Sequence, residues 1–288
     1  MKPAEFDYTR PADLTEVLRL LAEGGESKII AGGQSLVPMM NLRLARPERL
    51  IDINRLPGLD YVRLEGDHLV VGALARHADV KASALVARNA PMVAAAYDWI
   101  AHTAVRNRGT LCGNLCHADP ASEMPAVMLA IGASMVLRSA LGTRQVSAAD
   151  FFVGAFTTAL RADEMLMEVH LPVMPQGSGY GFHEVSMRKG DFAWASVAVQ
   201  MRCHAGKVQE AAIAVAGVGS CAARLHDVEK ALIGSTADAA VFARAGEAAA
   251  AAVKPPQDVM TPAAYRRDLI RALVPRALAD AVKPWSPV

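Results

Sequence analysis

The sequence predicts an α+β fold built from more than one module, and three observations lead to this prediction. The chain has 288 residues, which exceeds the usual size of a single domain. Two Pro- and Gly-rich stretches, Pro57-Gly58 and Pro172–Gly179, have the composition of boundaries. Strand and helix patterns alternate before the second stretch, whereas three strands and then three helices follow it. We therefore expect three parts, comprising residues 1–58, 59–175 and 176–288.

The first part reads as a small β-α-β-like unit. Pro11–Glu23 has apolar residues at helical spacing and stops at a glycine pair, which predicts a helix. Lys28–Ala31 and Leu50–Ile53 are short apolar runs that predict strands. The first strand runs directly into residues 32–35, GGQS. A glycine pair after a strand can present successive N–H groups to an anion, but the motif taken alone is weak evidence and a plain strand-to-helix turn is the favoured explanation.

The second part combines a predicted hairpin with several helices and strands. Glu65-Gly66-Asp67 separates two apolar runs, as in a β-hairpin. Periodicity then predicts the following elements. The expected hairpin strands are Tyr61–Leu64 and His68–Val71, the expected helices are Val80–Arg88, Met92–His102, Ala126–Gly132 and Val146–Phe151, and the expected later strands are Ser134–Leu137 and Met165–Leu171.

Between two of these helices lies the most polar loop of the chain. Arg106–Pro125 reads RNRGTLCGNLCHADPASEMP and combines glycines with hydroxyl, amide, imidazole and carboxylate side chains. Glycines allow main-chain N–H groups to approach a ligand closely, and a ligand rich in phosphates and hydroxyls would use these groups well. A plain turn of Gly, Asn and Asp remains an equal alternative.

The third part predicts a sheet covered by helices. Alternating and apolar runs indicate three strands, and longer periodic runs indicate three helices. The alanine-rich segment within 237–252 fits a closely packed helix better than a linker. The expected strands are Tyr180–Val185, Ser196–Cys203 and Val208–Gly217, and the expected helices are Leu225–Ile233, Ala237–Ala252 and Tyr265–Val282.

Composition and charge argue against several classes of function. The chain is 52% hydrophobic and 20% charged, which suits a packed core. Its 30 basic and 29 acidic residues give a net charge of +1, whereas a nucleic-acid surface needs a clustered basic excess. No signal peptide is recognised, and the longest apolar run, Ala126–Leu137, is shorter than the roughly 20 residues that span a bilayer. We expect a cytoplasmic protein without a nucleic-acid partner or a membrane span.

The four cysteines do not predict a metal site. Cys112, Cys116, Cys203 and Cys221 include no CxxC pair, which zinc and iron–sulfur sites commonly use. Reduced, buried thiols are expected instead. We also find no Ser/His/Asp set and no paired carboxylates from which to argue catalysis.

Three segments, taken together, resemble one known protein family. They are residues 28–53 (KIIAGGQSLVPMMNLRLARPERLIDI), 101–127 (AHTAVRNRGTLCGNLCHADPASEMPAV) and 187–201 (MRKGDFAWASVAVQM). In this order and spacing they closely resemble the FAD-binding medium subunits of molybdenum hydroxylases, such as those of aerobic carbon monoxide dehydrogenase and quinoline 2-oxidoreductase. The flavin domain of xanthine dehydrogenase is a more distant relative. The similarity extends over nearly the whole chain.

The resemblance implies a fold and a cofactor site. The expected fold is a two-subdomain α/β FAD-binding domain of the PCMH type, followed by an α+β C-terminal domain, with FAD in the cleft between the two subdomains. Residues 31–36 and 110–114 would hold the pyrophosphate, and Glu123 would accept hydrogen bonds from ribose or ribityl hydroxyls. The resemblance implies the following cofactor-binding residues: Ile29, Ile30, Ala31, Gly32, Gly33, Gln34, Ser35, Leu36, Ile100, Ala101, His102, Thr110, Cys112, Gly113, Asn114, Glu123, Leu166, Lys189 and Phe192.

Some of these assignments have structural alternatives. His102 also fits a helix-end histidine, and Leu166 and Phe192 also fit core packing, although Phe192 could cover the flavin ring. Relatives commonly have Gly-Gly-Asn where this chain has Cys112-Gly113-Asn114, so a side chain at 112 could alter FAD affinity or flavin access. His117 and Asp119 could orient the loop without touching FAD.

The resemblance implies an electron-transfer function. A large partner subunit with the molybdopterin cofactor would oxidise the substrate, and a small partner with [2Fe–2S] clusters would pass electrons to FAD in this chain and on to an external acceptor. A dimer of heterotrimers is expected, with no catalytic and no metal-binding residues in this chain. The alternatives are a stand-alone flavin-dependent reductase or oxidase and a non-enzymatic assembly module. The acceptor and the substrate stay open, with a slight leaning toward N-heterocycles.

Overall fold

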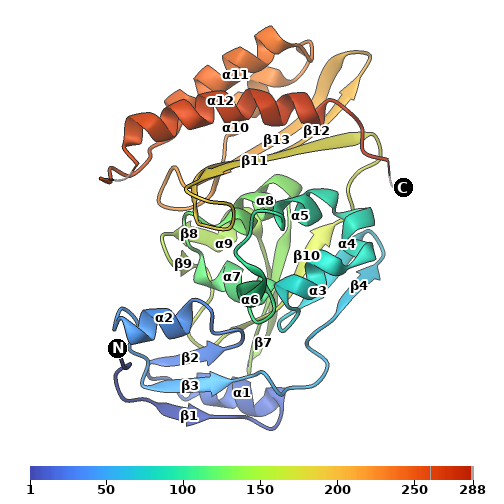
Figure 1. Cartoon of the computed structure of the whole chain (residues 1–288). Coiled ribbons are helices and arrows are strands. Elements are labelled where there is room, and N and C mark those ends of the chain that lie inside the picture. Colours follow the sequence, from blue (N-terminus) through green and yellow to red (C-terminus); the bar gives the residue numbers. More distant parts are fainter. Residues whose placement is uncertain (260, 287–288) are drawn as a thin grey trace.

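The three larger β-sheets of the described chain and their helices are stacked along one long axis of the molecule (Figure 1). The computed structural model describes residues 1–259 and 261–286. A parallel three-stranded sheet lies at one end, an antiparallel five-stranded sheet in the middle and an antiparallel four-stranded sheet at the other end. The mixture of helices and strands agrees with the α+β class predicted from the sequence.

The N-terminal sheet has the order β1-β3-β2. The predicted helix is confirmed, because Asp13 caps α1 by accepting from the Glu16 amide at 2.9 Å and the helix buries four apolar side chains. Both predicted strands are confirmed, whereas β1 and α2 were not predicted. The elements are β1 (Asp7–Thr9), α1 (Leu14–Ala22), β2 (Ser27–Ile30), α2 (Leu36–Asn41) and β3 (Arg49–Asp52).

The middle sheet has the order β4-β5-β10-β6-β7. The predicted hairpin is confirmed, with Gly66 at a φ of +59° in its turn. A small hairpin, β8–β9, lies beside the sheet (Figure 1). The strands are β4 (Val62–Glu65), β5 (His68–Gly72), β6 (Ser134–Ser139), β7 (Gly142–Ser147), β8 (Phe152–Gly154), β9 (Thr157–Thr158) and β10 (Met165–Pro172).

The helices of the middle part differ from the sequence prediction in three places. The predicted helix Val80–Arg88 is split at Ser83, whose hydroxyl caps the second piece. The predicted helix Met92–His102 already ends at Ala96, and the chain turns through Ala101 at a φ of +46°. The helices are α3 (His77–Ala82), α4 (Ala84–Asn89), α5 (Pro91–Ala96), α6 (Thr103–Arg106), α7 (Leu111–His117), α8 (Glu123–Ile131) and α9 (Ala148–Phe151).

The third difference is that the polar segment Arg106–Pro125 is largely helical. It contains all of α7 and the first turn of α8. Thr110 starts α7, since its hydroxyl accepts from the Gly113 amide at 3.0 Å. Strand β7 was also missing from the prediction, because its sequence, GTRQVS, has few apolar residues and lies at the edge of the sheet.

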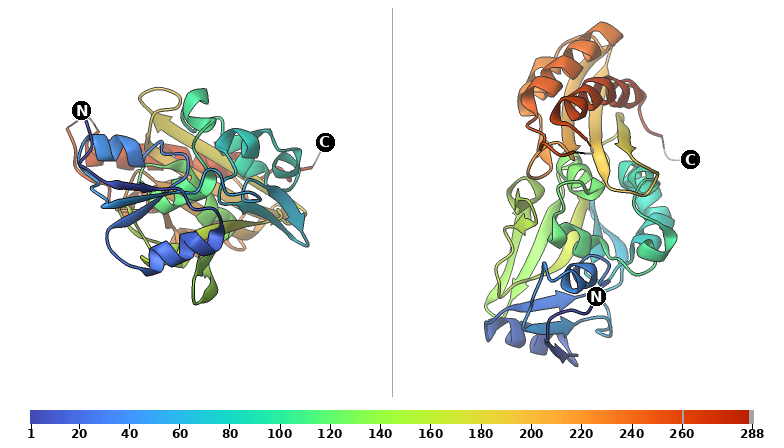
Figure 2. Two further views of the ribbon diagram at one scale, coloured as in Figure 1. Left: turned by 90° about the horizontal axis from the view of Figure 1, so that it is seen from below. Right: turned by 60° about the vertical axis from the view of Figure 1, so that its left-hand side comes forward.

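The C-terminal sheet has the order β11-β12-β13-β14, and helices α11 and α12 cover the face that points away from the rest of the molecule (Figures 1 and 2). Gly181 permits close packing, because a Cβ there would lie 2.8 Å from the Ala277 Cα of α12. The elements are β11 (Ser178–Ser186), β12 (Ala193–His204), β13 (Lys207–Ala216), β14 (Ala223–Arg224), α10 (His226–Leu232), α11 (Ala239–Ala252) and α12 (Ala263–Ala281).

Helix α8 connects the middle part to the C-terminal sheet. All nine of its residues are buried, and it belongs to one apolar core together with Ala198, Ala214 and Ala216 of the C-terminal sheet. A helix that is apolar on all sides has to be enclosed. Over the described residues, no helix is both long and apolar enough to cross a membrane.

Candidate functional site

The two glycine-bearing segments singled out in the sequence lie against each other. A Cβ on Gly32 would approach the Gly109 Cα to 2.6 Å and would collide with the Arg108 carbonyl. Only glycine allows the two backbones to come this close. Gly33, with a φ of +70°, then turns the chain into α2. The two segments thus form one continuous backbone surface.

Hydrogen bonds of the Asn54 and Arg76 side chains, called here the Arg76–Asn54 bridge, connect these two segments. The Asn54 amide donates to the Ala31 carbonyl at 2.7 Å. Arg76 donates to the Asn54 side-chain oxygen at 2.7 Å and also to the carbonyl of Arg108. Asp52 accepts from the Asn54 side chain at 2.7 Å. Arg76 and Asn54 therefore connect the segment after β2 with the segment before α7.

In front of this backbone surface lies a cavity of about 1040 Å³. Small-molecule sites usually measure roughly 300–1,000 Å³, so a large cofactor fits. Of the predicted cofactor residues, all but Lys189 line it. The predicted residues that the cavity brings together are Ile29, Ile30, Ala31, Gly32, Gly33, Gln34, Ser35, Leu36, Ile100, Ala101, His102, Thr110, Cys112, Gly113, Asn114, Glu123, Leu166 and Phe192.

The first segment offers unused main-chain donors to this cavity. Within the described chain, the amides of residues 32–35 donate to no other residue. Gln34 folds its side chain back and donates to the Gly32 carbonyl at 3.1 Å. Successive free amides in a glycine turn are a suitable cradle for phosphate oxygens. The residues present therefore fit a pyrophosphate.

Cys112, the departure from the glycine-rich family pattern, does not obstruct the cavity. It lies inside α7, and it is not among the residues with positive φ. Its thiol faces the backbone of β5, with Sγ 3.7 Å from the Gly72 carbonyl oxygen. Burial raises the pKa of the Cys112 thiol well above its ordinary value. The thiol is thus a packed, protonated group.

An acid lies at the start of α8. Glu123 lines the cavity and is only 4% exposed. Asn114 of α7 positions this helix start, because its side-chain amide exchanges hydrogen bonds of 2.9 and 3.1 Å with the Ser122 hydroxyl. Burial raises the pKa of Glu123 to about 7. Its oxygens are acceptors for ligand hydroxyls.

Another part of the cavity lining comes from two chain segments far apart in sequence. Gly190, with a φ of +95°, packs so closely on Ala101 and His102 that a Cβ would lie 2.9 Å from the Ala101 carbonyl oxygen. Phe192 lines the cavity and is 60% exposed, so it is not a core residue. Lys189 lies outside the cavity lining, with its ammonium 5.5 Å from the centre of the Trp99 ring.

Several residues of the site escaped the sequence analysis. His77 lines the cavity, and burial, followed by the charge of Arg106, lowers its pKa to about 4. Glu164 also lines the cavity and forms a bidentate ion pair with Arg144 at 2.6 and 2.8 Å. Phe156 enters from the β8–β9 hairpin at a φ of +53°. No local sequence signal marks these residues, because folding brings them to the cavity.

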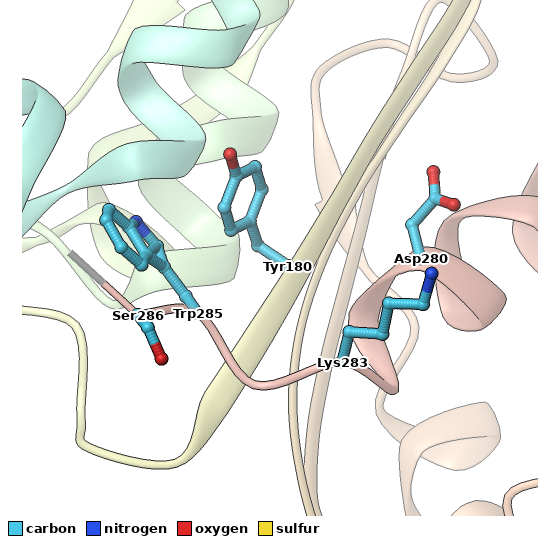
Figure 3. A pocket seen from close by; sticks show the side chains of 5 residues that line it. All are labelled: Tyr180, Asp280, Lys283, Trp285 and Ser286. Atoms are coloured by element: carbon cyan, nitrogen blue, oxygen red, sulfur yellow. The ribbon is translucent and has the colours of Figure 1, made fainter. Parts of the chain in front are cut away.

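A second, smaller cavity does not show a comparable arrangement. It has a volume of about 390 Å³ and lies where the C-terminal tail passes β11 (Figure 3). The tail residue Trp285 and Tyr180 lie on one side of β11, and the ends of Asp280 and Lys283 lie on the other. The described residues also contain no cluster of three or more metal-ligating side chains.

Comparison with known proteins agrees with this geometry. Residues 4–174 match the family described as the FAD binding domain in molybdopterin dehydrogenase. Residues 180–281 match the CO dehydrogenase flavoprotein C-terminal domain. Among curated proteins, the alpha subunit of the 6-hydroxypseudooxynicotine dehydrogenase complex of Paenarthrobacter nicotinovorans is 42% identical over 284 residues, covering 98% of this chain and 96% of the relative.

Two solved structures share the fold over nearly the full length. The carbon monoxide dehydrogenase of Hydrogenophaga pseudoflava superposes with a TM-score of 0.94 at 38% identity, covering 98% of both chains. Quinoline 2-oxidoreductase of Pseudomonas putida 86 gives a TM-score of 0.93 at 36% identity, again covering 98% of both chains. The likeness therefore includes both glycine-bearing segments and the C-terminal sheet.

Proposed function

Because this chain belongs to the family of FAD-binding subunits of molybdopterin dehydrogenases, we propose that it carries electrons within a molybdenum hydroxylase complex. In this proposal electrons come from the [2Fe–2S] clusters of a partner subunit and leave to an external acceptor, and a molybdenum subunit oxidises the substrate. Bound FAD would supply the redox chemistry. The contact between Gly32 and the backbone of residues 108–109 supports the proposal most strongly, because it builds one cradle from two distant segments.

The proposal assigns a task to each group of cavity residues. The free amides of residues 32–35 and the segment Thr110–Asn114 would hold the pyrophosphate without adding net charge. Glu123 would accept hydrogen bonds from ribose or ribityl hydroxyls. The flavin ring would be flanked by residues from three segments. These are Ile100 to His102, Leu166, and the stretch that carries Lys189 and Phe192.

The assembly follows from the same reasoning. The relatives named above are, by their descriptions, parts of complexes or dehydrogenases. We propose a small iron–sulfur partner, a large molybdopterin partner and a dimer of such heterotrimers in the cytoplasm. Within this chain we propose the division into residues 1–58, 59–175 and 176–288, with FAD between the first two.

The test uses the complex that this chain forms with its partner subunits in its native host. Removing the flavin should abolish reduction of an external acceptor dye, while substrate still reduces the iron–sulfur clusters, as followed by electron paramagnetic resonance. Adding FAD back should restore the dye reduction. The proposal is wrong if the flavin-free complex reduces the dye normally, or if the isolated FAD-loaded chain turns over an organic substrate by itself.

A further inference from the structure

His77, the first residue of α3, is built into the cavity wall beside the second glycine-bearing segment. It lines the cavity although it is only 4% exposed. Its main-chain amide donates to the Gly109 carbonyl at 2.9 Å. Its imidazole packs on Gly109, since a Cβ there would lie 2.9 Å from the His77 Cδ2 and 3.4 Å from Nε2. The ring is therefore held next to Gly109, one residue before Thr110.

The contact of this imidazole with Tyr97 fixes which ring nitrogen carries the proton. The His77 Nδ1 lies 3.2 Å from the hydroxyl oxygen of Tyr97, a residue with no exposed surface. Within the described chain the Tyr97 hydroxyl has no other hydrogen-bond partner. If Nδ1 donated to the phenol, the phenol proton would be buried without an acceptor, which is costly. The phenol therefore donates to Nδ1, and the neutral ring carries its proton on Nε2.

The Nε2–H group of His77 is a donor that the protein itself does not use. No residue of the described chain accepts a hydrogen bond from Nε2. Nε2 is not one of the fully enclosed atoms that lack a partner, so it is accessible, and the space that His77 lines is the cavity. Burial, and then the charge of Arg106, lowers the pKa of His77 to about 4, so the ring is neutral at physiological pH.

We propose that His77 is a further cofactor-binding residue whose Nε2–H donates to a phosphate oxygen of the bound dinucleotide, and that Tyr97 is the positioning residue that fixes this tautomer. A phosphate oxygen is the acceptor because Gly109, against which the ring packs, directly precedes residues 110–114, to which the pyrophosphate is assigned. A neutral N–H donor also suits a cradle that otherwise consists of main-chain amides. The inference rests on the proposed function for the identity of the ligand, whereas the tautomer follows from the protein alone.

The tautomer is observed by long-range ¹H–¹⁵N NMR of the flavin-free full-length chain at pH 7. His77 should show a protonated Nε2 and an unprotonated Nδ1, and its signals are identified by their loss in His77→Gln. A proton on Nδ1, or on both nitrogens, would overturn the inference.

Ligand fragments then show which part of the cofactor meets Nε2. FAD and ADP, which both carry a diphosphate, should shift the Nε2 signal of His77, whereas riboflavin, which has no phosphate, should not. A shift with riboflavin alone, or no shift while FAD binds, refutes the phosphate contact. If ADP binds and shifts the signal but FAD does not bind, the proposed function fails and the phosphate contact stands. If neither ligand binds, both fail.

FAD affinity separates hydrogen-bond donation by His77 from mere packing. His77→Phe keeps a ring but no donor, and its FAD affinity should fall roughly tenfold or more, because a hydrogen bond to a charged group is lost. His77→Gln can place an N–H near the position of Nε2 and should bind within about threefold of wild type. Wild-type affinity of the Phe variant, or an equal loss in both variants, refutes the donor role.

His170→Phe is the matched control. His170 is partly buried, lies outside the cavity lining and bonds to Glu168 at 3.0 Å. Its replacement should leave FAD affinity unchanged, and a loss equal to that of His77→Phe would show that the effect is not specific to the cavity.

Tyr97→Phe tests the positioning role and does not depend on whether His77→Phe folds. It removes only the phenol oxygen, so the His77 Nδ1 signal should move and a form with the proton on Nδ1 should become detectable. FAD affinity should fall about threefold, because part of the protein then lacks the Nε2–H donor. An unchanged His77 spectrum would refute the role given to Tyr97.

Discussion

Gly32 is the residue on which the shape of the site depends most. Any side chain here would collide with the backbone of residues 108–109, so the two segments would have to separate. We expect Gly32→Ala to weaken FAD binding by at least roughly a hundredfold, as expected when several main-chain hydrogen bonds to an anion are misplaced. Fluorescence titration of the apo chain with FAD measures this.

Gly154→Ala is the matched control for Gly32→Ala. Gly154 also has no positive φ, and its added Cβ would meet its nearest neighbour, the Thr157 Cβ, only at 4.0 Å. We expect wild-type affinity from this control. Equal affinities of all three proteins would show that the close approach at Gly32 is unimportant for binding.

We predict that the buried side chain of Cys112 stabilises the fold and has little effect on FAD affinity. Replacing it with glycine would remove a buried thiol and place glycine inside α7, which costs about 1 kcal/mol from helix propensity alone. We therefore expect Cys112→Gly to lower the melting temperature while FAD affinity stays within about twofold of wild type. A clear gain in FAD affinity would show that the side chain at position 112 obstructs the cofactor.

At the scale of elements, the Arg76–Asn54 bridge joins the first sheet to the segment before α7. Neither residue lines the cavity, so the bridge acts on the ligand only through the backbone that it holds. Arg76→Met keeps an apolar stem and removes the hydrogen bonds to Asn54 and to the Arg108 carbonyl. We expect FAD binding to weaken about tenfold, since a charged hydrogen-bond donor is lost.

Arg63→Met serves as the control for Arg76→Met. Arg63 also forms polar contacts, to Glu65 and Glu168, but it lies on a half-exposed surface away from the cavity lining. Its removal should leave FAD affinity unchanged. If both arginine variants bind FAD as the wild type does, the bridge has no role in forming the site.

The sequence could predict the parts of the site that local patterns encode. Residues 32–35 follow a strand directly, and the glycines near 109–113 sit in a polar segment, so both segments were recognisable. The Arg76–Asn54 bridge could not be recognised in the same way, because no sequence motif surrounds either residue. The contact between the two side chains forms only when three chain segments meet in the folded protein. Ala101 and Phe156 adopt positive φ values, a conformation for which a sequence usually has glycine. Because neither residue is glycine, the turns at these two positions were also missed.

At the scale of the whole molecule, the buried acids make stability depend on pH. The folded-state pKa of Glu184, about 8, lies above the ordinary value of 4.5. Between these values the folded protein holds a proton that the unfolded chain has released, so the free energy of unfolding falls as pH rises. One such group contributes at most about 1.4 kcal/mol per pH unit.

Urea unfolding between pH 5 and pH 8 measures this dependence. We expect the free energy of unfolding of the wild type, minus that of E184Q, to decrease steadily as pH increases over this range. His77, whose lowered pKa acts in the opposite direction below about pH 6.5, is present in both proteins and cancels in the difference. A difference that does not change with pH would contradict the raised pKa of Glu184.

The most direct test of the whole account is a crystal structure of this chain with FAD. We predict one FAD per chain, with its pyrophosphate on the amides of residues 32–35 and beside residues 110–114, and with a sugar or ribityl hydroxyl bonded to Glu123. A pyrophosphate bound anywhere else, or FAD lying outside the cavity in front of Gly32 and Gly109, would contradict it.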